Sequence, residues 1–108
     1  MNSTLTTAAD ISTITLEGRF DAHETDNFRF LVEPLVGKPS ACVVIDFSEV
    51  VFIDSTALAE LVRAMKHARS TEGDLILTSL STPVRIILEL TGLDRAFTIR
   101  NTESAARP

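Results

Sequence analysis

The sequence predicts a single α/β domain in which a mixed sheet of four to five strands packs against α-helices. Short apolar segments rich in β-branched residues alternate with segments whose apolar residues recur every three to four positions, the periods of strands and amphipathic helices. The chain has 108 residues, enough for one core and too few for a separate cofactor domain. No repeat, low-complexity tract or linker divides residues 1–108, so all of them are assigned to one domain.

The first two strands are predicted at residues 5–9 and 11–19, with Asp10 between them. Both segments are rich in β-branched residues, and the second alternates in the manner of a half-buried strand. We therefore expect a hairpin, which the run Gly18-Arg19-Phe20-Asp21 ends.

A first helix is predicted after residues 21–24. Asp21 and Glu24 fit an acidic form of the capping box, in which an N-cap acceptor is followed three residues later by a carboxylate. Gly37 is the stop signal, and the expected buried stripe consists of Phe28, Leu31, Val32 and Leu35. Because a proline inside a helix costs roughly 3 kcal/mol, Pro34 is expected to kink the helix or end it near residues 32–33.

The middle of the chain predicts a strand, a helix and a second strand. Residues 41–47 form a short, continuous apolar run, typical of a central strand covered on both faces, and residues 48–49 are expected to be its turn. A helix at residues 58–69 then leads to another buried strand at residues 75–80. This order is a crossover unit, which places the two strands in parallel.

A third helix is predicted to open at Thr82, with Pro83 at the first helical position, where its missing N–H does no harm. Gly92 is the expected C-terminal stop, and the buried stripe consists of Val84, Ile87 and Leu88. Residues 96–99 are the expected final strand, and residues 101–106 are a weak helix start.

Composition excludes several function classes. The chain is 44% hydrophobic and 23% charged, as is usual for a soluble globular protein. Its net charge of −5 argues against a nucleic-acid partner, which requires a basic face. Cys42 is the only cysteine, so no internal disulfide or cysteine-rich metal site can form. With no signal peptide or membrane-spanning run, we expect a cytoplasmic protein without membrane insertion.

The segment at residues 50–62 carries the candidate functional site. An apolar run stops at Asp54, Ser55 and Thr56, and helical spacing then resumes with Leu58, Leu61, Val62 and Met65. Small oxygen-bearing side chains at a helix start cap free backbone N–H groups. The same position favours an anion, so the Ser55 hydroxyl is also well placed to carry a phosphate. Both interpretations are compatible with the residues alone.

Enzymatic chemistry is not indicated. Ser55 does not lie in a Gly-x-Ser-x-Gly elbow, and the chain has no glycine-rich phosphate loop. His23 and His67 lack partners at metal-ligand spacing, and Asp54 adjoins Ser55 without an obvious base. We expect a binding protein with no catalytic residue, metal or cofactor.

Four segments together resemble one known family. They are residues 16–21 (Leu-Glu-Gly-Arg-Phe-Asp), residues 43–50 (Val-Val-Ile-Asp-Phe-Ser-Glu-Val), residues 52–58 (Phe-Ile-Asp-Ser-Thr-Ala-Leu), and Thr91-Gly92-Leu93 with the following Phe97 and Ile99. The chain resembles the STAS domain, and specifically the bacterial anti-anti-sigma factors, or anti-sigma factor antagonists. The resemblance covers nearly the whole chain and implies the STAS fold.

The resemblance implies a phosphorylation-controlled switch in transcription regulation. The unmodified form of such a protein binds an anti-sigma factor that is also a serine kinase, which frees the sigma factor for RNA polymerase. The kinase would phosphorylate Ser55, with Thr56 as a secondary acceptor, and a PP2C-type phosphatase would reset the switch. The residues that the resemblance assigns to the partner-binding surface are Asp21, Asp54, Ser55, Thr56, Ala57 and Leu58.

One position departs from the family pattern and leaves an alternative open. Ala57 stands where the family usually has glycine. Alanine favours the helix by about 1 kcal/mol, but its methyl group is expected to occupy space that the backbone of a partner would approach. The alternative function is a constitutive STAS adaptor, such as the soluble subunit of a lipid-transport or other membrane complex, in which Ser55 only caps a helix. A small nucleotide-binding domain is a third reading.

Overall fold

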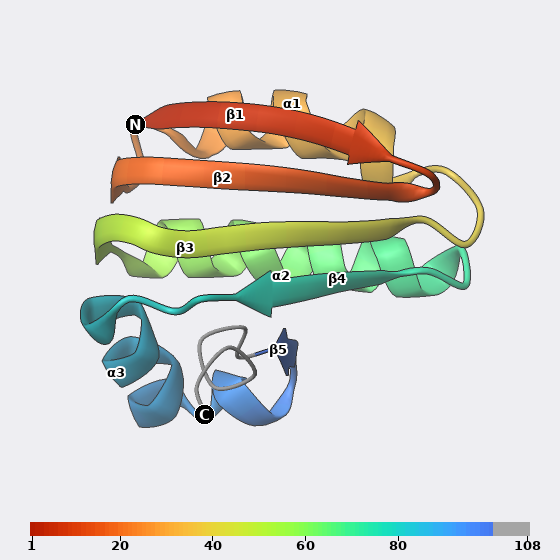
Figure 1. Ribbon diagram of the computed structural model, residues 1–108. Coiled ribbons are helices and arrows are strands. Elements are labelled where there is room, and N and C mark those ends of the chain that lie inside the picture. Colours follow the sequence, from red (N-terminus) through yellow and green to blue (C-terminus); the bar gives the residue numbers. More distant parts are fainter. Residues whose placement is uncertain (101–108) are drawn as a thin grey trace, which may run out of the picture.

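The computed structural model describes residues 1–100, and within them it contains a five-stranded mixed sheet flanked by helices (Figure 1). The strand order is β1-β2-β3-β4-β5; β1 is antiparallel to β2, and all the other neighbours are parallel. The predicted α/β class is confirmed. In chain order the elements are β1 (Asn2–Ala8), β2 (Ile11–Phe20), α1 (Thr25–Val36), β3 (Cys42–Ile53), α2 (Ser55–Ser70), β4 (Asp74–Thr78), α3 (Thr82–Thr91), the 3-10 helix η1 (Leu93–Arg95) and β5 (Thr98–Arg100).

The predicted hairpin and the predicted crossover are both confirmed. Ala8 of β1 is paired with Ile11 of β2, which leaves Ala9 and Asp10 as a two-residue turn. Ala9 adopts a φ of 55° there, the positive φ that tight hairpin turns require. Strands β3 and β4 run in parallel on either side of the α2 connection.

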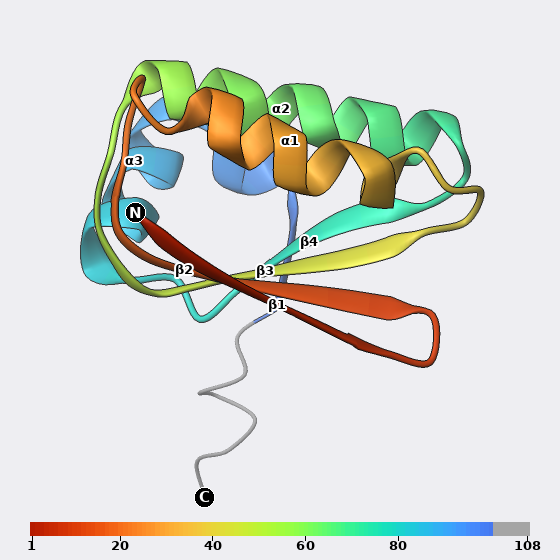
Figure 2. The same ribbon diagram turned by 90° about the horizontal axis from the view of Figure 1, so that it is seen from above.

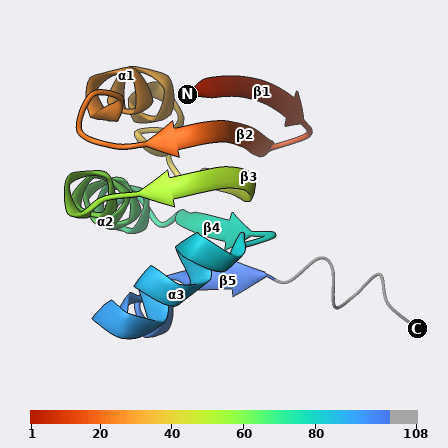
Figure 3. The same ribbon diagram turned by 90° about the vertical axis from the view of Figure 1, so that its left-hand side faces the viewer.

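Both long helices lie on the same face of the sheet, so the prediction that β3 is covered on both faces is wrong. Figures 2 and 3 show α1 and α2 side by side in one layer, and no helix of residues 1–100 lies on the opposite face of the sheet. Along the first half of β3, buried Val43 and Ile45 alternate with half-buried Cys42 and Val44. The reason is chain topology. Crossovers between parallel strands are right-handed, and the two crossovers advance in the same direction across the sheet, so their helices share one face.

Strand β3 continues through residues 48–49, where a turn was predicted. The interruption in the apolar pattern arises from two irregularities of the β2–β3 pairing. Between Thr15 and Glu17 of β2, strand β3 has one extra residue, and it has another between Gly18 and Arg19. Such bulges bend a strand and redirect its side chains. Gly18 has a φ of +97°, a conformation that glycine adopts without a Cβ penalty.

Helix α1 passes Pro34 and ends at Val36, so the predicted early end near residues 32–33 is wrong. Pro34 lies in the last turn, where it removes a single helical N–H, and its side chain is exposed. The buried residues Val32 and Val36 continue the apolar stripe past it. Packing of this stripe outweighs the local cost of the proline, because tertiary burial supplies most of the stability of a helix.

The C-terminal elements follow the prediction with a shift of boundaries. Helix α3 begins at Thr82 with a proline in its first turn and ends at Thr91, and its C-cap Gly92 has a left-handed φ of 75°. The last strand, β5, starts two residues later than predicted because the chain first makes η1, closed by a hydrogen bond from the Ala96 N–H to the Leu93 carbonyl. The predicted helix start at residues 101–106 lies outside the described part of the chain.

An ion-pair network joins the exposed sides of α1 and α2. Glu60, which is buried, accepts hydrogen bonds from Arg29 and Arg63. Arg63 also binds Glu33 at 2.7 Å, and Glu33 lies 2.7 Å from Nδ1 of His67. The hydrogen bond from Arg29 lowers the pKa of Glu60, and the one from Arg63 lowers the pKa of Glu33, in both cases against the effect of burial. The network fixes the position of α1 relative to α2 on the sheet.

Candidate functional site

The candidate site lies at the carboxyl ends of β2 and β3, the end of the sheet that faces the viewer in Figure 3. Phe20 and Ile53, the last residues of these parallel strands, are paired in register. Asp21 and Asp54 follow them directly, and Ser55 opens α2. Because parallel strands end at the same edge of a sheet, residues 33 positions apart in the chain meet at one corner.

Asp54 is the N-cap of α2 and also holds the loop before α1. Its Oδ1 accepts a hydrogen bond from the Ala57 N–H at 2.9 Å, and its Oδ2 accepts one from the Ala22 N–H at 3.0 Å. Its own N–H donates to the Phe20 carbonyl at 3.3 Å. One half-buried carboxylate therefore ties the first turn of α2 to the β2–α1 loop.

Asp21 stabilises the turn before α1, and the predicted capping box is wrong. The N-cap of α1 is Glu24, whose side chain makes no capping hydrogen bond. Asp21 instead accepts from the His23 N–H with Oδ1 at 3.0 Å, and from the Glu24 N–H with its carbonyl at 2.9 Å. These bonds form a local turn, typical of aspartate before a helix. The half-buried Asp21 carboxylate also lies 3.7 Å from Nε of Arg19.

Ser55 and Thr56 occupy the first turn of α2, and both are exposed. Within residues 1–100 neither hydroxyl makes a hydrogen bond, since the capping acceptor is the Asp54 carboxylate. The Ser55 side chain therefore does not cap α2 in this structure. Its hydroxyl is free at the positive end of a 16-residue helix, a position that favours an added anion.

Ala57 and Leu58, which the sequence placed on the partner-binding surface, lie in the core. Ala57 is fully buried, and Leu58 is 5% exposed. The expectation that the Ala57 methyl group fills space near a partner is therefore wrong, because this methyl group points into the protein. The reason is helical periodicity. Ala57 and Leu58 each lie two positions after an exposed residue, and two positions are about half a helical turn. Their side chains therefore point toward the sheet instead of toward solvent.

The structure adds an exposed apolar pair that the sequence analysis missed. Val51 is 64% exposed and Phe52 is 36% exposed, although both belong to the apolar run that stops at Asp54. The guanidinium of Arg19 stacks over the Phe52 ring at 4.0 Å. Both side chains face solvent because the second β3 bulge lies at this point. The only sequence signal for these exposed side chains is the Ser-Glu pair at residues 48–49, which interrupts the apolar pattern of β3.

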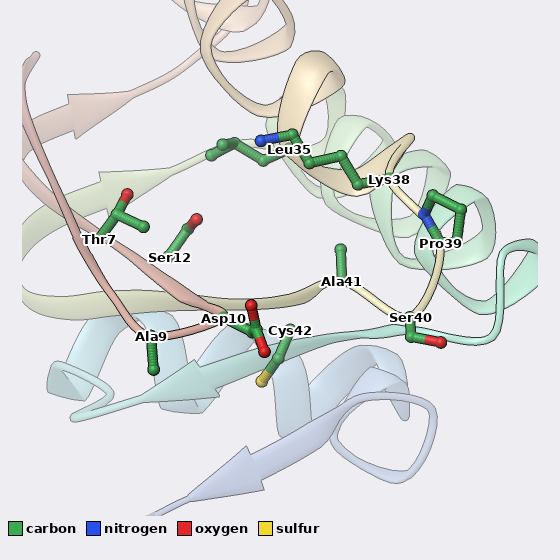
Figure 4. Close-up of a pocket in the computed structure, with 10 residues that line it drawn as sticks. All are labelled: Thr7, Ala9, Asp10, Ser12, Leu35, Lys38, Pro39, Ser40, Ala41 and Cys42. Carbon is green, nitrogen blue, oxygen red and sulfur yellow. The ribbon is translucent and has the colours of Figure 1, made fainter.

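Among the surface hollows of residues 1–100, one lies at each end of the sheet. One, of about 430 Å³, lies along the β3 bulge beside the candidate site, where Gly18, Val51 and Pro83 line it. The other, of about 340 Å³, lies at the opposite end of the sheet, between the hairpin turn and the α1–β3 loop (Figure 4). Its charged residues are Asp10 and Lys38.

In the described part of the chain no three His, Cys, Asp or Glu side chains are grouped so that they could hold a metal ion. Over residues 1–100, no helix has the length and apolar character that crossing a membrane requires.

Comparisons with known proteins agree with this architecture. The model of the STAS domain family matches residues 2–106. The anti-sigma-B factor antagonist of Listeria monocytogenes is 32% identical over 90 residues, which cover 83% of this chain and 79% of that protein. A Thermotoga maritima structure assigned as an anti-sigma factor antagonist superposes with a TM-score of 0.84 at 25% identity, covering 96% of this chain and 90% of the other. The unphosphorylated anti-sigma factor antagonist SpoIIAA, at 20% identity, shares the fold with a TM-score of 0.79, covering 97% and 93% of the two chains.

Proposed function

Because the chain belongs to the STAS domain family, we propose that it is an anti-sigma factor antagonist whose binding is switched by phosphorylation of Ser55. The unmodified protein binds an anti-sigma factor that is also a serine kinase, and this releases a sigma factor. The kinase supplies ATP and the catalytic groups and transfers the phosphate to Ser55. A PP2C-type phosphatase removes it. This chain contributes a binding surface and a phosphate acceptor, and no catalytic residue.

The observation that carries the proposal is the free Ser55 hydroxyl at the start of α2. It is exposed and makes no hydrogen bond within residues 1–100, since Asp54 caps the helix. A kinase can reach it without unfolding the first turn. The resulting phosphate is tolerated in the folded domain, because the helix N-terminus interacts favourably with an anion. Thr56 is exposed as well, and we assign it as the secondary acceptor.

The effect of the phosphate on binding is electrostatic. Phosphorylation adds about −1.5 to −2 charges at a corner that already contains the Asp54 and Asp21 carboxylates. A partner that packs over this corner would have to desolvate the new charge beside two others. A loss of about 3 kcal/mol lowers affinity on the order of a hundredfold. That change is enough to operate a switch without refolding the domain.

The contact surface of the proposed complex includes an apolar part next to the acceptor. Val51 and Phe52 precede Ser55 by four and three positions, and both are exposed. Arg19 holds the Phe52 ring in place from the neighbouring strand. An exposed apolar pair with a polar rim is a frequent feature of protein-binding surfaces. The apolar pair supplies affinity, and the serine beside it supplies control.

The test combines phosphorylation with binding. The protein is incubated with ATP, magnesium and each candidate anti-sigma kinase of its source, and intact-mass spectrometry follows the wild type and the Ser55→Ala and Thr56→Ala variants. The expected result is one phosphate on the wild type and on Thr56→Ala, and none on Ser55→Ala. Calorimetric titration should then show binding of the unmodified protein and about a hundredfold weaker binding of the phosphorylated form.

A different outcome would favour the constitutive adaptor. If no kinase modifies the chain while it binds another partner stably, and Ser55→Asp leaves that binding unchanged, the switch is excluded. The adaptor receives no support from Ala57, because its buried methyl group does not alter the surface.

A further inference from the structure

The outer edge of β1 pairs with no strand of residues 1–100. All seven residues of β1 are exposed, and within residues 1–100 the strand pairs only with β2. In an edge strand every second residue directs its N–H and C=O groups outward, which is a template for another strand. The opposite edge of the sheet is different, since β5 has only three residues and ends in Arg100.

The β1 sequence lacks the features that normally protect an edge. It reads Asn-Ser-Thr-Leu-Thr-Thr-Ala, without a charge, a proline or a glycine. Natural edge strands are usually protected by lysine, proline, a bulge or short length. Strand β1 pairs with β2 in unbroken register from Asn2 to Ala8, so it has no bulge. The strand is neutral in a chain of net charge −5, so a second copy can approach here without facing a charged strand.

One apolar side chain of β1, that of Leu5, is less buried than its paired neighbour on β2. Leu5 is paired with Ile14, and paired residues share a sheet face, so both point toward the helices. Ile14 is fully buried, but Leu5 is 43% exposed. Helix α1 is the outermost helix at this edge, with no element beyond it (Figure 3). Leu31 of α1 is also only partly buried.

We propose that two copies of this chain associate through their β1 strands in an antiparallel pair, forming a continuous ten-stranded sheet. Pairing over all seven residues places Leu5 opposite Leu5 of the second copy, and Thr4 opposite Thr6 of the second copy. The two leucines then cover one another on the helix side. The threonine pairs lie on the open side, where β-branched cross-strand pairs stabilise a sheet.

The assembly closes at two copies. The two-fold axis is perpendicular to the sheet, so both helix layers lie on the same face, and among the described residues the outermost strands are the short β5 strands. The two Ser55 corners point to opposite ends of the combined sheet. Both therefore stay accessible, and the dimer does not depend on the proposed phosphorylation.

Sedimentation velocity over a micromolar to millimolar concentration series tests the proposal. The expected result for the wild type is a shift from the 11.8 kDa monomer to twice that mass. The variant Thr4→Lys/Thr6→Lys places like charges opposite each other, and its dimer should dissociate with a constant about tenfold higher or more. The variant Thr4→Lys/Thr6→Glu carries substitutions at the same positions but places opposite charges together, and should restore dimerisation to within a few-fold.

Leu90→Lys serves as the control, because Leu90 is an exposed apolar residue on α3, away from the β1 edge. Thermal melts followed by circular dichroism show that each variant is folded. A wild type that stays monomeric at every concentration overturns the proposal. It is equally overturned by a dimer that resists Thr4→Lys/Thr6→Lys, that is lost in Leu90→Lys, or that Thr4→Lys/Thr6→Glu fails to restore.

Discussion

The carboxylate of Asp54 accepts a hydrogen bond from the backbone N–H of Ala22 at 3.0 Å, across 32 positions of the chain. Its other oxygen caps α2 through Ala57. The β2–α1 loop and the first turn of α2 are therefore positioned by the same side chain. A residue that the sequence marks as a helix cap and a partner-binding residue therefore also fixes the position of the β2–α1 loop relative to the start of α2.

Replacing Asp54 by alanine should lower the free energy of unfolding by about 1 to 2 kcal/mol, since the change removes a helix cap and a second backbone hydrogen bond. Asp54→Asn should lose less, because the amide oxygen can still accept one of the two bonds. Urea denaturation measures both changes. Asp10→Ala, at an exposed turn residue, is the control. Equal stability of Asp54→Ala and the wild type would contradict the capping role.

Replacing Val51 by serine should weaken binding to the anti-sigma factor about tenfold, because the change removes an exposed apolar contact beside Ser55. Since the side chain is 64% exposed, the free energy of unfolding should change by less than about 0.5 kcal/mol. Titration calorimetry measures the affinity. Phe30→Ser is the matched control, because Phe30 is 87% exposed on α1, away from the corner. Unchanged affinity of Val51→Ser would exclude this residue from the contact.

The free energy of unfolding should fall in acid below about pH 4.3, the ordinary pKa of glutamate. Hydrogen bonds from arginines lower the pKa values of Glu60 and Glu33 in the folded state. A lowered pKa contributes stability that is present above the unfolded value and is lost as the pH falls through the folded value. Denaturant titrations between pH 2 and pH 7, on the order of one pH unit apart, measure the slope.

Glu60→Gln provides the comparison for this acid effect. The free energy of unfolding of this variant should be lower than that of the wild type by about 1 kcal/mol at neutral pH, the upper end for partly exposed ion pairs. It should also decline less steeply as the pH falls. Glu89→Gln removes the same charge from an exposed position of α3 and should retain the wild-type slope. Identical acid profiles for the two variants would contradict the role of the network.

Two glycine-to-alanine substitutions should destabilise the domain for different reasons. At Gly18 the φ of +97° is unfavourable for alanine, although a Cβ would meet only the Met1 Cα at 3.8 Å, so the cost is conformational, about 1 to 2 kcal/mol. At Gly73 a Cβ would lie 2.1 Å from the Ala41 carbonyl oxygen. The backbone would have to move there, and the loss should reach about 3 kcal/mol. The melting temperature of Gly73→Ala should therefore be lower than that of Gly18→Ala, and the reverse order would contradict these assignments.

Local signals were sufficient for the elements that the sequence predicted well. The start of α2 could be predicted because Asp54 and the apolar spacing from Leu58 onward act within one segment of chain. The end of α3 followed from Gly92 for the same reason. The length of β3 could not be predicted, because its two bulges exist only in relation to β2. The exposed side chains of Val51 and Phe52 depend on those bulges, and so they were missed.

The sequence by itself determined the α/β class, the order of the elements and the place of Ser55 at a helix start, since periodicity and capping act over a few neighbouring residues. Only the tertiary structure decided which face of the sheet the helices cover, that Asp54 leaves the Ser55 hydroxyl free, and that Ala57 and Leu58 belong to the core. These features depend on strand pairing, crossover handedness and packing. Each of them involves groups that are far apart in the chain and meet only when it folds.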